Sequence, residues 1–359
     1  MSPTRILAAK VFSLASLLAV LLCPGCGRGA KALPPVPSGS FLLAVDSAMQ
    51  SLVVDTIATN GTLSSKTTAG TFLQPTKVLT LIDNIYTLNT GSSSISQFSI
   101  STSGAVSVGP STLTGTGPVQ FAFDPTSKFL VVANRTSKSL SIYSVASDGS
   151  LQSINNGFPL TFSPLSLAFA GDLLYVASST GITGLLFDSS TGSLTVLSNF
   201  SLATANLSYL LADGSGTHLF ATDLATNSVI AFSIASTTGI LTQLPATPTG
   251  TGPVIMTFDP AGKFLYVVSN VGDDISVFSL DHSTGALTAV SGSPFPTLLA
   301  GANSVALDSN DEFIFVGSAS GKQVAVLQVN SITGALTPVT SSPFAVIFAP
   351  EALAVIRPI

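Results

Sequence analysis

The sequence predicts an all-β fold, a seven-bladed β-propeller whose blades are four-stranded antiparallel sheets. Three observations predict it. One glycine recurs roughly every 45 residues, and a period of 40 to 50 residues with four strands per repeat is typical of propeller blades. Short apolar runs rich in β-branched residues separate the turn signals, and no stretch shows helical spacing. The recurring glycines are Gly61, Gly104, Gly149, Gly192, Gly239, Gly285 and Gly334.

The clearest repeat runs from Gly250 to Val290. Two of its apolar runs, Val254 to Phe258 and Phe264 to Val268, are too short for helices, and the sequence Asp-Pro-Ala-Gly between them has the residues of a type I turn. A third strand around Ile275 leads into a hairpin at Gly285, which can adopt a positive φ, and a fourth strand follows it. Because both faces of this sheet are apolar, it must be buried between neighbouring sheets.

The position of the repeats along the chain predicts how the ring closes. The first repeat begins at a second strand, Phe41 to Val45, and a lone apolar strand, Ala352 to Ile356, follows the seventh. We expect this last strand to pair with the three strands of the first repeat. The ring then has no free edge, and residues 41–359 form one propeller.

The N-terminal residues predict export. Residues 1–26 contain a basic start, a twelve-residue apolar run and small residues, which is the layout of a secretory signal and too short to span a bilayer. The segment Leu22 to Gly27 resembles a bacterial lipoprotein cleavage box in which Cys26 is lipidated; a plain secretory signal is the alternative. Residues 27–40 form a Pro, Gly and Ser linker. We therefore expect an outer-membrane lipoprotein, periplasmic or at the cell surface, held to the membrane only by its lipid anchor.

The composition excludes several kinds of site. The net charge of -5 and the lack of a basic run argue against nucleic acid. The only cysteines are Cys23 and Cys26, and two separated histidines make no zinc site, so we expect no metal and no cofactor. With 46% hydrophobic and only 8% charged residues, the chain suits stacked sheets with a polar rim. A monomer is expected.

Several motifs resemble those of a known family. They are GTGPV at Gly115 to Val119, its partial copy at Thr251 to Val254, and FDPxxKFL at Phe123 to Leu130 and Phe258 to Leu265. These motifs resemble the seven-bladed lactonase-type propellers, which include 6-phosphogluconolactonases, carboxymuconate-cyclising enzymes and surface proteins with YVTN-type repeats. The resemblance covers roughly residues 40 to 359, and it implies a group of Arg, His and acidic side chains at the mouth of the central channel.

Candidate site residues follow from the two faces of a propeller. The connections between blades and the loops joining second and third strands share one face, called here the top face, whereas His218, His282 and Glu312 belong to the opposite face. Arg135 and Glu351 form the one expected top-face pair that could polarise a lactone carbonyl and activate water. Other candidates for ligand binding on this face are Asn89, Ser179, Asp223, Asn270, Asp273, Asp274 and Lys322. The alternatives are solvated loop charges and, for Asp273 with Asp274, a calcium ion.

Three functions remain open at this point. The first is a non-catalytic, extracytoplasmic module that binds a small polar ligand, a glycan or a protein. The second is a lactone hydrolase, which the resemblance implies. The third is an adhesion or polysaccharide-binding protein of the cell surface. The motifs are turn and strand residues, so they specify the blade more closely than the chemistry.

Overall fold

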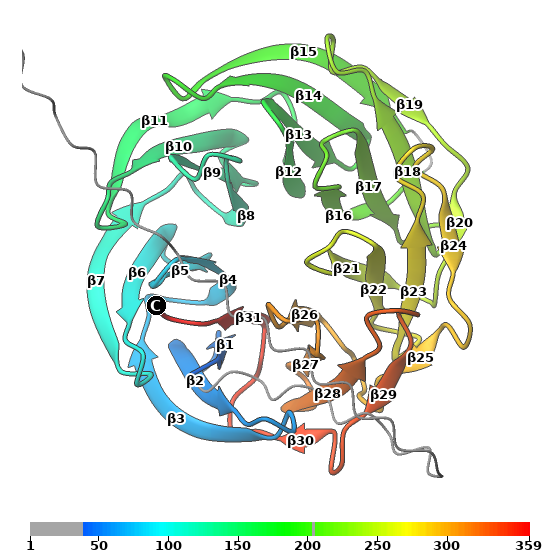
Figure 1. The fold of residues 1–359 in the computed structure, drawn as a ribbon. Helices are drawn as coiled ribbons and strands as arrows, with labels where there is room; N and C mark the ends of the chain where they lie inside the picture. Colours follow the sequence, from blue (N-terminus) through cyan, green and yellow to red (C-terminus); the bar gives the residue numbers. More distant parts are fainter. Residues whose placement is uncertain (1–38, 203–204) are drawn as a thin grey trace, which may run out of the picture. The chain divides into compact units, whose positions relative to one another are not determined.

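The computed structural model describes residues 39–202 and 205–359. Seven antiparallel sheets surround a central axis, and no helix occurs in these two ranges (Figure 1). The seven-bladed propeller predicted from the sequence is therefore confirmed. The expected signal peptide, Cys26 and most of the linker lie outside the described residues.

Blade 1 contains β1 (Phe41–Asp46), β2 (Ser51–Ile57), β3 (Leu63–Gly70) and, as its inner strand, β31 (Ala352–Ile356). Blade 2 consists of β4 (Pro75–Leu81), β5 (Asn84–Asn89), β6 (Ser94–Ile100) and β7 (Val106–Leu113). Blade 3 consists of β8 (Pro118–Phe123), β9 (Phe129–Asn134), β10 (Ser139–Val145) and β11 (Leu151–Pro159). Blade 4 consists of β12 (Ser166–Ala170), β13 (Leu173–Ser178), β14 (Gly181–Asp188) and β15 (Ser193–Ser201).

Blades 5, 6 and 7 have an outer strand split into two short pieces. Blade 5 consists of β16 (Leu207–Ala212), β17 (His218–Asp223), β18 (Ser228–Ile234), β19 (Leu241–Gln243) and β20 (Thr247–Pro248). Blade 6 consists of β21 (Pro253–Phe258), β22 (Phe264–Ser269), β23 (Asp274–Leu280), β24 (Leu287–Ala289) and β25 (Phe295–Pro296). Blade 7 consists of β26 (Ser304–Leu307), β27 (Phe313–Ser318), β28 (Gln323–Val329), β29 (Leu336–Pro338) and β30 (Phe344–Ala345).

The fourth strand expected in blade 6 is present as β24, and after a break the ladder continues as β25, a second short piece that the sequence did not predict. In blade 6, Gly292 with φ of +92° and Pro294 interrupt the ladder between β24 and β25. The hydroxyl of Ser293 then accepts a hydrogen bond of 2.9 Å from the backbone N–H of Val277. A side chain thus replaces the missing backbone acceptor, because proline cannot donate to a ladder and glycine weakens a strand.

The ring closes as the sequence predicts. β31 pairs antiparallel with β1, with Leu43 opposite Ala354, so the order of strands in blade 1 is β3-β2-β1-β31. In Figure 1 the red β31 lies beside the blue β1. Blade 1 is therefore built from both ends of the described chain. The inner edge of β1 is paired with β31, just as the second strand of every other blade is paired with its own inner strand.

The recurring glycines are required where neighbouring blades meet. Each adopts a φ between +66° and +81°, and each faces the residue that begins the second strand of the preceding blade. A Cβ on Gly61 would lie 2.8 Å from Cε1 of Phe313, and one on Gly192 would lie 2.8 Å from Cε1 of Phe129. Any other residue would be strained by its backbone and would also collide with a neighbouring blade, which explains the period in the sequence.

The core consists of seven apolar clusters, one between each pair of adjacent blades. Tyr86 and Tyr175 occupy equivalent positions in two of them, and their hydroxyls donate to the carbonyls of the hairpin glycines Gly149 and Gly239. Both faces of each sheet are thus buried against neighbours. This arrangement leaves the inner strands to line the central channel.

Candidate functional site at the channel

The inner strands of all seven blades surround a cavity of about 480 Å³. It extends along the axis of the propeller, and its lining is mainly apolar: Val78, Leu79, Ala122, Ala168, Leu211, Ile255, Val305 and Ala354 contribute to it. Four large polar residues, Lys77, Gln120, Tyr209 and Glu351, also line it, together with Thr80 and Thr257. A concave, mostly apolar site with a few converging polar groups is the usual form of a small-molecule site.

Lys77 on β4 is the one charged residue in the seven inner strands. It follows an irregularity in the pairing of β4 with β5, between Pro75 and Lys77. Its side chain is partly exposed to the channel, and Nζ makes no hydrogen bond with another described residue. Burial lowers the pKa of Lys77, and the nearby carboxylate of Glu351 partly opposes this effect. The channel therefore contains an amine whose charged form burial disfavours and whose Nζ has no hydrogen-bond partner among the described residues.

Glu351 is placed by the closure of the ring. It immediately precedes β31, and its backbone N–H donates to the carbonyl of Val45, at 3.0 Å. The hydroxyl of Ser47 donates to Oε1 of Glu351, at 2.9 Å. Oδ2 of Asp46 accepts a hydrogen bond from the N–H of Ala349, which fixes the preceding turn. The position of this carboxylate is thus determined by contacts with the first repeat.

Gln120 and Tyr209 supply the neutral polar groups. Each is the third residue of its inner strand and follows an irregularity in the pairing, as Lys77 does. Burial raises the pKa of Tyr209, although a hydrogen bond with the side chain of Gln120 opposes the change. Gln120 on β8 belongs to blade 3 and Tyr209 on β16 belongs to blade 5, so the two side chains face the channel from blades that are not adjacent.

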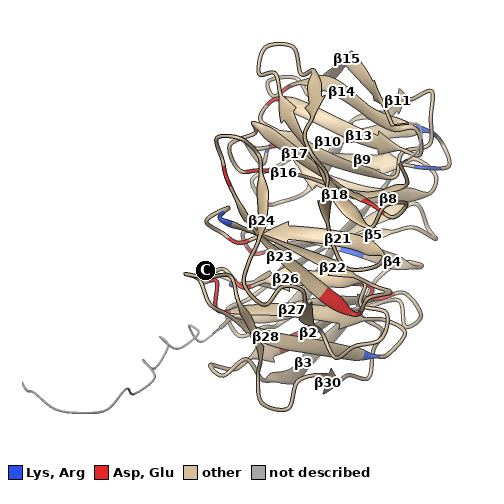
Figure 2. Ribbon diagram, turned by 90° about the vertical axis from the view of Figure 1, so that its right-hand side faces the viewer, with Lys and Arg blue, Asp and Glu red and all other residues tan. Residues whose placement is uncertain are grey.

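The two residues expected to act as a pair are placed differently. Glu351 lines the channel cavity, whereas Arg135 lies exposed in the β9–β10 loop and is not among its lining residues. No hydrogen bond or ion pair joins them among the described residues. Charged residues are sparse over the whole ribbon (Figure 2), and in the cavity it is Lys77 that accompanies Glu351.

Two of the other candidates stabilise their own loops. The amide of Asn89 is buried and donates to the hydroxyls of Ser94 and Ser96. Asp223 is 2% exposed and accepts hydrogen bonds from the backbone of Asn206 and Ala225. Groups that are buried and fully engaged in this way have little left to offer a ligand.

Of the remaining candidates, Asn270 and Asp273 lie in the β22–β23 connection and Asp274 begins β23, whereas Ser179 and Lys322 lie in the equivalent connections of blades 4 and 7. Asp273 accepts a hydrogen bond from the N–H of Gly301, and burial raises the pKa of Asp274, with Asp273 adding to the rise. Asn270 is half-buried, whereas Ser179 and Lys322 are exposed. None of these five lines the channel cavity. Within the described ranges, no cluster of three or more His, Cys, Asp or Glu side chains has an arrangement that could hold a metal ion.

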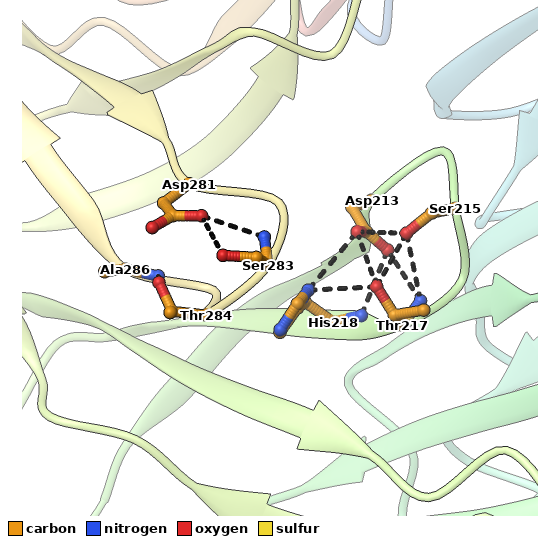
Figure 3. Close-up of polar contacts among 8 residues, drawn as sticks. All are labelled: Asp213, Ser215, Thr217, His218, Asp281, Ser283, Thr284 and Ala286. Carbon is orange, nitrogen blue, oxygen red and sulfur yellow. Dashed lines mark hydrogen bonds and ion pairs between the residues drawn. The ribbon is translucent and has the colours of Figure 1, made fainter.

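The histidines lie on the opposite face, where His218 begins β17 and His282 lies in the β23–β24 connection. His218 is 5% exposed, and its ring contacts Gly285 of the next blade. Figure 3 shows Nδ1 of His218 beside Asp213, 3.4 Å from Oδ2. Burial opposes ionisation of Asp213, but hydrogen bonds from Ser215 and His218 lower its pKa overall. His282 is exposed in the hairpin that also contains Asp281. The contacts between His218 and Asp213 stabilise their own turn, and neither histidine lines the channel cavity.

Sequence reasoning missed Lys77, Gln120 and Tyr209, although a signal was present. Pro75, Pro118 and Pro253 begin equivalent inner strands, and the residue two positions later points to the channel. Aligning the repeats on these prolines would have placed Lys77 and Gln120 in one ring of side chains, with Ile255 as the apolar equivalent. A lysine in an otherwise apolar strand is then the exception that marks a site.

The described residues contain no helix long and apolar enough to cross a membrane. No curated protein matches the sequence. Solved structures share the fold. A periplasmic gluconolactonase from Pseudomonas aeruginosa has a TM-score of 0.76 and 16% identity, and the match covers 88% of this chain and 99% of the other. A candidate 6-phosphogluconolactonase from Bacteroides uniformis has a TM-score of 0.75 and 17% identity, with 89% of this chain and 100% of the other covered. A functionally unknown protein from Desulfotomaculum acetoxidans is also similar, with a TM-score of 0.71, 17% identity, and coverage of 89% of this chain and 99% of the other.

The model of one family matches most of the propeller. The family is described as lactonase, 7-bladed beta-propeller, and the matched residues are 75–169, 168–259 and 256–348. These segments include six of the seven blades and the inner strands that carry Lys77, Gln120 and Tyr209. The chain belongs to the lactonase family of seven-bladed β-propellers.

Proposed function

We propose that the channel cavity binds a small polar ligand with carbonyl or carboxylate oxygens, and that the protein is a non-catalytic binding module. One observation carries the proposal. The ammonium of Lys77 faces a cavity of about 480 Å³ with the carboxylate of Glu351 nearby, but no ion pair within 4.0 Å joins them in the described part of the chain. Both groups are therefore available to a ligand.

The four polar groups match the chemistry of an aldonic acid or its lactone. The Lys77 ammonium can donate to a carboxylate or a carbonyl oxygen, and the Glu351 carboxylate can accept from ligand hydroxyls. Gln120 on blade 3 and Tyr209 on blade 5 offer further donors and acceptors. Apolar side chains lie between them, and polar contacts with a ligand are stronger next to such side chains than in open water.

The location that we propose is outside the cytoplasm. The support is the signal-like composition of residues 1–26, the cleavage-box-like segment ending at Cys26 and the Pro-rich linker of residues 27–40. The similar fold of a periplasmic gluconolactonase agrees with a propeller in that compartment. We expect a lipid at Cys26 to hold the domain at the outer membrane.

Lactone hydrolysis is the second candidate, and the same pair of residues favours it. Glu351 could take a proton from water, whose oxygen would attack the lactone carbonyl carbon while Lys77 stabilises the oxygen that becomes negative. The ring C–O bond would then break, and the departing alkoxide would receive the proton. This reaction needs Lys77 charged and Glu351 ionised at the same time. Family membership alone does not select between binding and hydrolysis.

Two measurements would distinguish the binding module from the lactone hydrolase. One is calorimetric titration of the protein with aldonic acids, and the other is an assay of the acid released when their lactones are hydrolysed. We expect saturable binding of an aldonic acid, weakened about tenfold or more by Lys77→Met and by Glu351→Gln. Arg135→Ala is the matched control, an exposed cation of the same face outside the cavity, and it should bind normally. Lactone turnover that Glu351→Gln abolishes would establish the enzyme instead. Binding of neither acids nor lactones would overturn both functions.

A further inference from the structure

A second cavity lies at the junction of blades 7 and 1, away from the channel. It measures about 220 Å³. One wall is formed by β2 and β3 of blade 1, and the other by β30 and the segment that leads from it toward β31. The lining residues are Asp55, Leu63, Ser65, Phe344, Ala345, Val346, Ile347 and Phe348. It shares no lining residue with the channel cavity.

The walls of this cavity are apolar. Phe344, Val346 and Leu63 are partly buried against the cluster between blades 7 and 1, and Phe348 is 3% exposed. The alternating residues Ala345 and Ile347 face outward, with Ile347 77% exposed. The segment 344–348 therefore packs as an extended strip whose inner face bears aromatic and branched side chains. Such walls suit an apolar or aromatic group of ligand size.

One carboxylate interrupts this apolar lining. Asp55 is 4% exposed and follows an irregularity in the pairing of β2 with β3, between Val54 and Asp55. Its Oδ1 has no hydrogen-bond partner among the described residues, and the one ion pair found there joins His218 and Asp213. A buried carboxylate is normally paired, because leaving a buried charge without a partner is costly. Among the side chains that the structure describes, Asp55 therefore has no counter-charge, and the cavity has room for one.

We propose that this cavity binds a small organic ammonium ion with an aromatic or branched apolar body. The ammonium would donate to Oδ1 of Asp55, and the apolar body would lie between Leu63, Phe344 and Phe348. Charge complementarity selects this class, since a neutral apolar molecule would leave the carboxylate unpaired and an anion would be repelled. A charge-assisted hydrogen bond is roughly twice as strong as a neutral one, so the amine is preferred over the matching alcohol.

Calorimetric titration of the full chain with benzylammonium chloride at neutral pH tests the site. We expect saturable binding with a Kd on the order of 0.1 to 1 mM, and binding at least about tenfold weaker for benzyl alcohol and for Asp55→Asn. Asp172→Asn, which changes an exposed carboxylate of another blade, should bind as the wild type does. Binding that Asp55→Asn leaves unchanged, or no saturation by about 10 mM, would overturn the proposal.

A second variant guards against a change of fold. Val346→Phe keeps Asp55 and the charge of the protein but fills the cavity with a larger side chain, so it should also abolish binding of benzylammonium. If Val346→Phe retains the circular dichroism of the wild type and still binds the amine with equal affinity, the ligand does not occupy this cavity and the proposal fails. Binding of aldonic acids at the channel should be unaffected by either variant, because the two cavities share no lining residue.

Discussion

Lys77 on the inner strand of blade 2 and Glu351 just before the inner strand of blade 1 face one cavity, and the charge of Glu351 opposes the lowering of the Lys77 pKa that burial causes. Two charges that interact without an ion pair should be coupled weakly but measurably. We expect a double-mutant cycle of Lys77→Met and Glu351→Gln, with free energies of unfolding measured in urea, to give a favourable coupling free energy of about 0.5 to 1 kcal/mol. Strict additivity would show that the two groups do not sense one another.

The hairpin glycines offer a direct test of the packing between blades. Gly61→Ala should destabilise the protein by about 2 to 4 kcal/mol, because the residue has a φ of +80° and its new Cβ would meet the ring of Phe313. Gly70→Ala is the control, since no atom lies within 4 Å of its Cβ position. Thermal unfolding compares the two. An equal melting temperature for both variants would contradict the packing described here.

Ring closure depends on a single strand. Deletion of residues 351–359 removes β31, leaves the inner edge of β1 unpaired and exposes buried residues such as Leu43. We expect the shortened protein to lose its sharp unfolding transition or to aggregate, since an exposed apolar edge pairs with other chains. Calorimetry and light scattering would report this. A cooperative transition at the temperature of the full chain would mean that six complete blades suffice.

Asp55 gives the stability a specific dependence on pH. Burial raises the pKa of Asp55 from 3.8 to about 6, so the folded protein holds this proton more tightly than the unfolded chain does. The stability that the neutral carboxyl contributes is present below about pH 4 and is lost as the pH rises through about 6. Asp55→Asn should therefore unfold like the wild type at pH 4 but be more stable by about 2 kcal/mol at pH 7.5.

The comparison is made at each pH separately, because other carboxyl groups with raised pKa values, such as Asp311, titrate in the same range in both proteins. Asp172→Asn serves as the control and should differ little from the wild type at either pH. A difference between wild type and Asp55→Asn that is constant from pH 4 to pH 7.5 would show that the folded state does not perturb this carboxyl.

Much of the fold could be predicted from the sequence, because the same local chemistry is repeated. The hairpin glycines are fixed by backbone conformation and by contact with the next blade, so their period identifies the blade. The strand Ala352–Ile356 could be assigned to blade 1 because it has no hairpin after it. The split of the outer strand in blade 6 was not foreseen, since it depends on the hydroxyl of Ser293 replacing a backbone acceptor.

The channel site was less accessible to sequence reasoning. Charges in loops attract attention, and Arg135 lies in a loop between second and third strands. Each strand away from the axis adds about 4.8 Å, so such a loop lies one to two strand spacings outside the inner strands that line the channel. Lys77 lies on an inner strand whose other residues are apolar or neutral, and only the ring arrangement of seven strands turns it toward the axis.

The pairing of β31 with β1 also sets the order in which the proposed site can be completed. Lys77, Gln120 and Tyr209 belong to strands that leave the ribosome well before Glu351 does. The carboxylate reaches the channel only when the last inner strand docks on the first blade, which requires contacts between residues about 300 positions apart, and such long-range contacts form slowly. A chain that has not closed its ring therefore has the cation of the cavity without the acid, so assembly of the fold itself would act as the check on a competent site.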